Sequence, residues 1–158
     1  MYAVRLWSVR HAGPLRRLYD VLAGAAVRLR PIIERIGYAR LEAPVAAVER
    51  GVKGLMFDCR MCGECVLAST GLSCPMNCPK LLRNGPCGGV RPDGSCEVEP
   101  AMRCVWVEAW AGAQRMGDEA AITAVSAPLD NRNSGTSAWL RAARKSAAAA
   151  LPDDGGPG

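Results

Sequence analysis

The sequence predicts a small, mostly α-helical single domain with little β-structure and an irregular, loop-rich region that binds metal through cysteines. Three observations support this fold class. A length of 158 residues allows one domain and excludes a (β/α)₈ barrel, which needs about 200 residues or more. Aromatic residues make up only 5% of the chain, so few bulky side chains can fill a core. All eight cysteines lie between Cys59 and Cys104, which indicates metal ligation as the extra source of stability.

Residues 1–52 are predicted to form a basic, amphipathic helical segment. Pro14 suits the first turn of a helix, Pro31 ends that helix or starts a short second one, and Gly37 can close the second. A third helix is predicted from Pro44. The apolar positions at helical spacing are Leu15, Leu18, Tyr19, Leu22, Ala26 and Leu29 in the first helix, and Val45, Val48, Val52 and Leu55 in the third. Each helix has one apolar face, which must pack on another helix, on the cysteine region or on another chain.

The charge of the chain is concentrated in this segment. Residues 1–50 hold nine arginines, no lysine and four acidic residues, so they carry the whole formal net charge of +5. A solvated helix surface is the preferred interpretation, and an anionic partner is the alternative. The segment lacks interleaved aromatic residues, which argues against nucleic-acid binding. Its apolar face lacks Trp and Phe, which argues against a membrane-surface helix.

Residues 53–117 form the predicted cysteine-rich metal-cluster domain. Gly and Pro are frequent there, and no helical or strand periodicity is sustained, so loops and single turns are expected. The run from Arg91 to Gly94 predicts a turn between two very short strands near Val90 and Val98. A helix follows Pro100 and ends near Gly117. Its two tryptophans, Trp106 and Trp110, lie four residues apart; they are expected to pack on one helix face and could also shield a cluster.

Residues 118–158 are predicted to form an extended, partly disordered C-terminal tail. The segment contains Ala-Pro-Leu-Asp, a polar Asn-Arg-Asn-Ser-Gly run, an alanine run and a Pro/Gly/Asp end. Disorder is expected after about Ala147. Trp139 and Leu140 stand out as an apolar pair, which is expected to dock locally or to anchor on a partner chain.

The cysteine spacing carries the chemistry, and all eight cysteines are candidate metal ligands. Three thiolates within seven residues can bind three corners of an iron–sulfur cubane, and a distal Cys-Pro supplies the fourth. Both Cys74 and Cys78 precede a proline. Eight cysteines make two sets of four, so two [4Fe-4S] clusters are predicted, with Lys80 and Arg83 near enough in sequence to offset their charge. The series is Cys59-x₂-Cys62-x₂-Cys65-x₈-Cys74-x₃-Cys78-x₈-Cys87-x₈-Cys96-x₇-Cys104.

Zinc is the main alternative to iron and sulfide. Structural zinc sites usually combine two Cys-x₂-Cys pairs, whereas this chain has one triplet and no second pair. One cluster together with one zinc ion stays open. Disulfides are the weakest interpretation, because the N-terminus lacks a signal peptide, no apolar run is long enough to cross a membrane, and a cytoplasmic location is therefore expected. His11, the only histidine, is expected to be a surface residue.

No motif for organic catalysis is present. The chain lacks a dinucleotide-binding glycine motif, a phosphate-binding loop, a serine nucleophile elbow and a zinc-protease motif. A catalytic cysteine needs a nearby histidine, and none lies in the cysteine region. The sequence therefore predicts no catalytic or organic-cofactor site of its own.

The cysteine region resembles one protein family closely. The resemblance rests on Phe57-Asp58-Cys59-x₂-Cys62-Gly63-x-Cys65-Val66-Leu67, Thr70-Gly71-x₂-Cys74-Pro75-Met76-x-Cys78-Pro79-Lys80, Arg83-Asn84-Gly85-Pro86-Cys87-Gly88-Gly89, Gly94-x-Cys96-Glu97-Val98 and Cys104-Val105-Trp106. These runs are similar to the cysteine-rich C-terminal domain of methylenetetrahydrofolate reductase, which in some bacteria is a separate small subunit.

The resemblance implies a function in one-carbon folate metabolism. The chain would be an iron–sulfur accessory or electron-transfer subunit, not catalytic alone, that docks on a flavin-containing barrel subunit of the reductase and relays electrons to it. The alternative is a zinc-stapled structural or interaction module without redox activity. Iron and sulfide content would favour the first function, and zinc alone the second.

Overall fold

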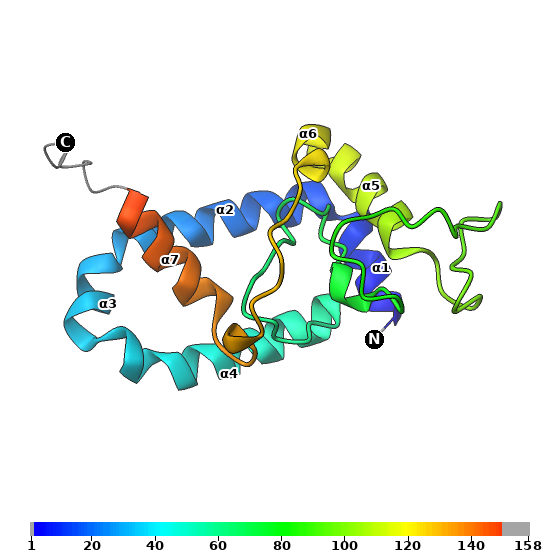
Figure 1. The fold of residues 1–158 in the computed structure, drawn as a ribbon. Coiled ribbons are helices and arrows are strands. Elements are labelled where there is room, and N and C mark those ends of the chain that lie inside the picture. Colours follow the sequence, from blue (N-terminus) through cyan, green and yellow to red (C-terminus); the bar gives the residue numbers. More distant parts are fainter. Residues whose placement is uncertain (1, 150–158) are drawn as a thin grey trace, which may run out of the picture.

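The computed structural model describes residues 2–149, and Figure 1 shows a chain that is mostly helical, with long irregular stretches in the cysteine region and between α6 and α7. The helices are α1 (Tyr2–Arg10), α2 (Ala12–Arg28), α3 (Arg30–Ile36), α4 (Tyr38–Phe57), α5 (Val105–Met116), α6 (Glu119–Thr123) and α7 (Ala138–Ala149), with 3₁₀ turns η1 (Pro75–Asn77) and η2 (Asn131–Asn133). Within residues 2–149, pairing of β type is limited to two isolated bridges. The predicted mostly α-helical fold with little β-structure is confirmed.

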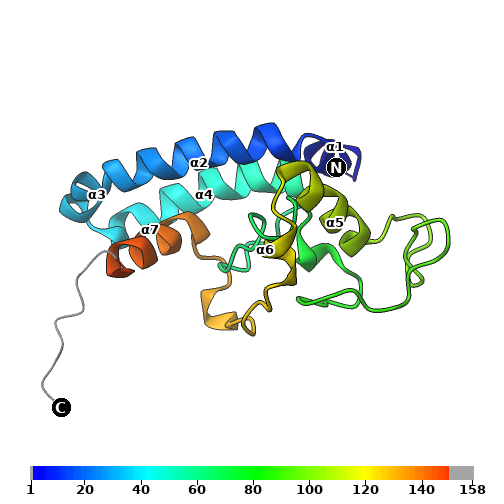
Figure 2. The same ribbon diagram turned by 90° about the horizontal axis from the view of Figure 1, so that it is seen from above.

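Helices α2, α3 and α4 form one layer of the molecule. Within it α2 and α4 run in opposite directions and are joined by α3, and α7 packs against both α2 and α4 on one face (Figures 1 and 2). At the other end α1 packs on α4 and α5, and α5 also packs on α2 and α6. The cysteine loops fill the space between α4 and α5. None of the described helices is long and apolar enough to cross a membrane.

The first helices follow the predicted signals, with one correction. Pro14 lies in the first turn of α2, Pro31 lies in the first turn of α3, and Gly37 caps α3. The helix that was predicted to start at Pro44 starts six residues earlier, at Tyr38. Pro44 removes one helical hydrogen bond, to the carbonyl of Arg40, but both residues are exposed, so water can bond that carbonyl. This early part of α4 is held by the C-terminal segment: the Arg144 guanidinium lies 4.5 Å from the centre of the Tyr38 ring, and the amide of Ser137 donates to Glu42.

Two small cores hold the cysteine region against the helices. One consists of Ala12, Phe57, Leu67, Leu72 and Cys74, and the other of Cys104, Trp106 and Ala109. The loop approaches α5 so closely that a side chain on Gly112 would overlap the backbone of Gly71, and a side chain on Gly71 would overlap the backbone of α5. Gly71 also has φ +57°, which favours glycine. Two glycines therefore set the distance between the loop and α5.

The predicted turn at residues 91–94 is present, but the two strands are not. The amide of Gly94 donates to the carbonyl of Arg91 at 2.8 Å. Val90 forms a single bridge with Cys96, and Val98 is exposed and unbridged. The neighbouring Ser95 forms the second bridge, with Arg103, so each bridge consists of a single residue pair. The following helix α5 ends at Gly117 as predicted.

The C-terminal segment is more ordered than its composition predicted. Residues 119–123 and 138–149 are helical instead of extended. The reason is tertiary: Leu140 is buried, and the hydroxyl of Ser137, which directly precedes the last helix, donates to Glu49 of α4. Trp139 and Leu140 therefore dock locally. The disorder expected after Ala147 falls largely on residues 150–158, which lie outside the described residues.

Candidate metal centre

Four of the eight cysteines line one cavity beside the end of α4. They are the triplet Cys59, Cys62 and Cys65 together with the first distal cysteine, Cys74. The spacing predicts that the triplet is joined by a distal Cys-Pro, for which both Cys74 and Cys78 qualify, and Cys74 is the one that lines this cavity. All four are free thiols, and Cys65 is the exposed one.

The chain positions these cysteines by closing α4 and reversing at once. Asp58 adopts the left-handed conformation (φ 53°) and caps α4, and Met61 is also left-handed (φ 50°). These two residues bend the triplet back over the helix end. The side-chain amide of Asn77 then donates to the carbonyl of Phe57 at 2.8 Å, which ties η1 and the preceding Cys74 to the same helix end.

The thiols of Cys59 and Cys74 lie in a poorly solvated place. Burial raises the pKa of Cys74 to about 12 and also raises the pKa of Cys59. The backbone amide of Met61 points at the Cys59 sulfur at 3.4 Å and works in the opposite direction. Since a coordinating thiol must lose its proton, a bound metal would supply the charge that makes the thiolates stable here.

Two cationic side chains line the same cavity. Lys53 is 3% exposed, and its Nζ forms an ion pair of 2.6 Å with Glu49. Burial alone would lower the pKa of Lys53, but the sulfur of Cys65 and the carboxylate of Glu49 outweigh it, so the pKa is raised. Arg83 donates to the backbone carbonyls of Ala127 and Glu64 at 2.9 and 3.1 Å. Its Nη1 is buried and has no hydrogen-bond partner among the described residues.

The other four cysteines are placed apart from this cavity. Cys78 follows η1, Cys87 accepts the amide of Gly89 at 3.4 Å, Cys96 lies in the Val90 bridge, and Cys104 caps α5. Within residues 2–149 no three side chains of His, Cys, Asp or Glu converge tightly enough to hold a single ion. Of the eight candidate ligands, the structure thus places four around one cavity, and their role as ligands stays a prediction.

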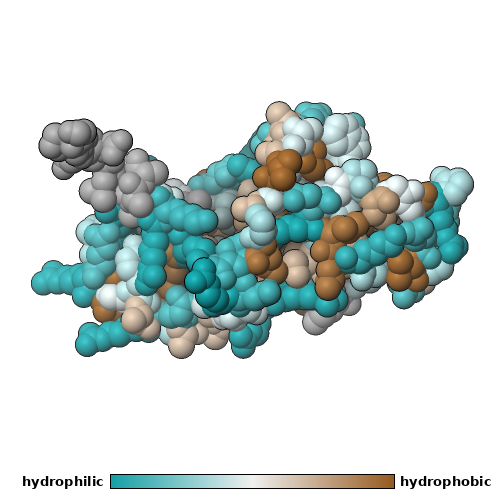
Figure 3. Space-filling model, in the orientation of Figure 1, coloured by the Kyte–Doolittle hydropathy of each residue, from teal (hydrophilic) through white to brown (hydrophobic). Residues whose placement is uncertain are grey.

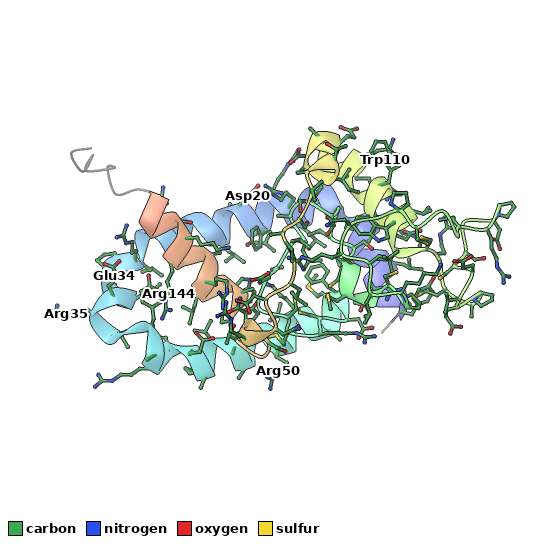
Figure 4. The ribbon with its side chains drawn as sticks, in the orientation of Figure 1. Asp20, Glu34, Arg35, Arg50, Trp110 and Arg144 are labelled. Carbon is green, nitrogen blue, oxygen red and sulfur yellow. The ribbon has the colours of Figure 1, made fainter. Side chains whose placement is uncertain are left out.

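Three further expectations concern residues around the site. Arg83 lies at the cavity as expected, whereas Lys80 forms an exposed ion pair with Glu97 away from it. Trp106 and Trp110 line a different, largely apolar cavity between the loop at Pro86 and α6, so they do not shield the four cysteines. Trp110 lies on the outer side of α5 (Figure 4).

Sequence reasoning missed the Glu49–Lys53 pair. The two residues are four apart on α4 and share a face with the buried Ala46 and Phe57. That spacing was the available signal, because an opposite-charge pair at i and i+4 in the middle of a buried stripe must be paired internally. His11, by contrast, stacks on Trp7 at the surface, as expected.

Comparison with known proteins gives one match. Residues 38–132 match the model of a family described as methylene-tetrahydrofolate reductase C terminal. The matched part runs from the start of α4 to η2 and contains all eight cysteines. No curated relative and no solved structure matches the chain at a comparable standard.

Proposed function

Because the chain belongs to the family of methylene-tetrahydrofolate reductase C-terminal domains, we propose that it is a non-catalytic iron–sulfur subunit of a flavin-dependent methylenetetrahydrofolate reductase. Folate and flavin chemistry would take place on a separate barrel subunit. The role of this chain would be to dock on that subunit and to relay electrons to its flavin.

The observation that carries the proposal is the cavity with four cysteines and two cations. Cys59, Cys62, Cys65 and Cys74 would hold one [4Fe-4S] cluster, which supplies one-electron transfer when bound. Such a cluster with four thiolates is anionic, and the donor set fits it. Lys53 offers a buried positive charge and Arg83 an unpartnered buried N–H at the same cavity.

A triplet followed by Cys-Pro also favours a cluster over zinc. Zinc sites usually use two pairs of ligands, and a neutral Cys₂His₂ site is excluded because the only histidine is stacked on Trp7. The remaining cysteines do not line this cavity, and a second cluster on them stays a prediction; they are Cys78, Cys87, Cys96 and Cys104.

The surface of helices α2, α3 and α4 supports the proposal that the chain docks on a partner. Apolar residues are exposed on the three helices α2, α3 and α4, namely Leu18, Val21, Leu22, Ile32, Ile36, Val48, Val52 and Leu55. The same three helices carry exposed arginines without a salt bridge among the described residues, namely Arg17, Arg28, Arg35, Arg40 and Arg50. Arg35 and Arg50 point away from the body of the molecule (Figure 4). A partner surface with an apolar centre and carboxylates at its edge would match this face.

A second copy of this chain matches it less well. Two such faces would bring arginines against arginines, which repel each other. We therefore propose the reductase subunit, with an acidic docking surface, as the occupant. Figure 3 shows the other side of the molecule, where hydrophobic side chains gather instead toward the α5 and α6 end.

Anaerobic purification tests the cofactor directly. Iron and acid-labile sulfide should be present in about equal amounts, and the visible absorbance should bleach with dithionite. Zinc alone, with no chromophore, would contradict the iron–sulfur proposal and leave a structural module.

Electron relay is tested by rapid mixing of the reduced chain with the oxidised flavin subunit. Flavin bleaching should match reoxidation of the cluster in rate and in amount. A complex that forms without electron exchange would restrict the chain to docking.

A further inference from the structure

The segment from Asn133 to Leu140, here called the closing segment, covers the cysteine triplet although it lies beyond the residues that match the family. Its amide at Gly135 donates to the carbonyl of Met61 at 2.7 Å, and the side-chain amide of Asn133 donates to Glu64 at 2.8 Å. Gly63, within the triplet, lies so close to Asn133 that any side chain there would collide with its backbone.

The same segment holds the buried carboxylate of Glu49. The hydroxyl of Ser137 donates to Glu49 Oε2 at 2.7 Å, and the amide of Trp139 donates to the same oxygen at 3.2 Å. Lys53 occupies the other oxygen at 2.6 Å. Lys53 Nζ also lies 5.1 Å from the centre of the Trp139 ring. Glu49 is 1% exposed and Ser137 is 1% exposed, so the network excludes water.

A buried ion pair of this kind is a poor stabilising device by itself. Taking both charges out of water is costly, and apolar residues of similar volume often stabilise a fold equally well. Its position gives it another use. Glu49, Lys53, Thr136 and Ala138 all line the cavity of the four cysteines, so the ammonium of Lys53 shares this cavity with the sulfur of Cys65.

We infer that the closing segment is part of the metal site and that Lys53 is a positioning residue for its electrostatics. Glu49 and Ser137 hold the Lys53 ammonium beside Cys65, where it stabilises the more negative, reduced form of an iron–sulfur cluster. The reduction potential is thereby raised. This inference rests on the proposed function, because it needs a cluster at these cysteines.

The test compares reduction potentials of the full chain purified anaerobically. Lys53→Met should make the midpoint potential more negative, and Lys53→Arg should restore most of it because the charge returns. Ser137→Ala should shift the potential in the same direction by less, since Lys53 keeps Glu49. The matched controls are Lys80→Met, which removes an exposed paired cation, and Ser146→Ala on the exposed side of α7; both should leave the potential unchanged.

Two results would overturn the inference. Equal potentials for Lys53→Met and Lys80→Met would show that the buried cation has no influence on the cluster. A shift in Lys53→Met that Lys53→Arg reproduces in full would assign the effect to packing. If Lys53→Met fails to fold, Ser137→Ala against Ser146→Ala decides the same question. Wild-type chain without iron would instead defeat the proposed function itself, so the two failures are distinguishable.

Discussion

Among the four cavity cysteines, Cys65 is the one exposed to solvent, and it shares the cavity with the buried ammonium of Lys53. Its substitution should therefore remove a ligand with little loss of core packing. We expect Cys65→Ser to lose most of the iron bound at the cavity, because serine is a poor substitute for a thiolate. Iron per chain and visible absorbance measure this.

The matched control for Cys65→Ser is Cys87→Ser, which changes a half-buried cysteine outside the cavity. The cavity cluster should persist in this variant. Identical losses of iron in both variants would contradict the assignment of the four cavity cysteines as one ligand set.

The gathering of the cysteine triplet with a distal cysteine could be predicted at the residue scale, and the charged residues around it could not. Spacing alone grouped Cys59, Cys62 and Cys65 with a distal Cys-Pro, because ligand spacing is a local property. Lys53 lies near the end of α4. The carboxylate of its partner Glu49 accepts a hydrogen bond from the hydroxyl of Ser137, which lies 88 residues after Glu49 in the chain. No periodicity in the sequence encodes such a contact.

At the scale of elements, two helical glycines differ in the space available for a side chain. Gly112 in α5 has no room for a methyl group, because it lies against the backbone of Gly71, whereas Gly51 in α4 has nothing within 4 Å of that position. Alanine is normally the better helix former by about 0.5–1 kcal/mol. Gly51→Ala should therefore raise the free energy of unfolding by about that amount, and Gly112→Ala should lower it.

Urea unfolding of the iron-loaded chain measures both free energies. A Gly112→Ala variant as stable as Gly51→Ala would show that the loop and α5 are not in the close contact described.

Helix boundaries were predicted correctly where proline and glycine set them locally. They were predicted wrongly where tertiary packing determines whether a segment is helical. Pro31 and Gly37 bound α3 as expected, since proline and glycine act through backbone geometry. The start of α4 before Pro44 and the whole of α7 depend on tertiary contacts, such as that of Ser137 with Glu49. The alanine-rich composition of α7 gave no sign of them.

In the whole molecule, the two sides of the layer formed by α2, α3 and α4 differ in what they contact. The cysteine loops and α7 occupy one side of the α2–α4 layer (Figure 2), and the apolar, arginine-bordered residues are exposed elsewhere on the same helices. On α4, for example, Ala46 and Lys53 are buried while Val48 and Val52 are exposed. The same helices can therefore contribute buried residues to the candidate metal site and exposed residues to a partner surface.

This arrangement predicts which substitutions disrupt assembly without harming the metal site. Leu22→Asp on α2 and Val52→Asp on α4 should weaken binding to the flavin subunit by about tenfold or more, since each would bury an unpaired charge. Iron content should not change, because neither residue lines the cysteine cavity. Calorimetric titration of the iron-loaded chain with the flavin subunit measures the affinity.

Val125→Asp is the matched control, because Val125 is 86% exposed and lies outside the α2–α4 layer. It should bind like the wild-type chain. Raising the salt concentration should weaken the wild-type complex, since exposed arginines facing carboxylates are screened over about 8–10 Å at physiological ionic strength. Unchanged affinity in Leu22→Asp and Val52→Asp would move the interface to another face. Loss of self-association in these variants, with no effect on flavin-subunit binding, would instead identify a second copy of the chain as the occupant of this surface.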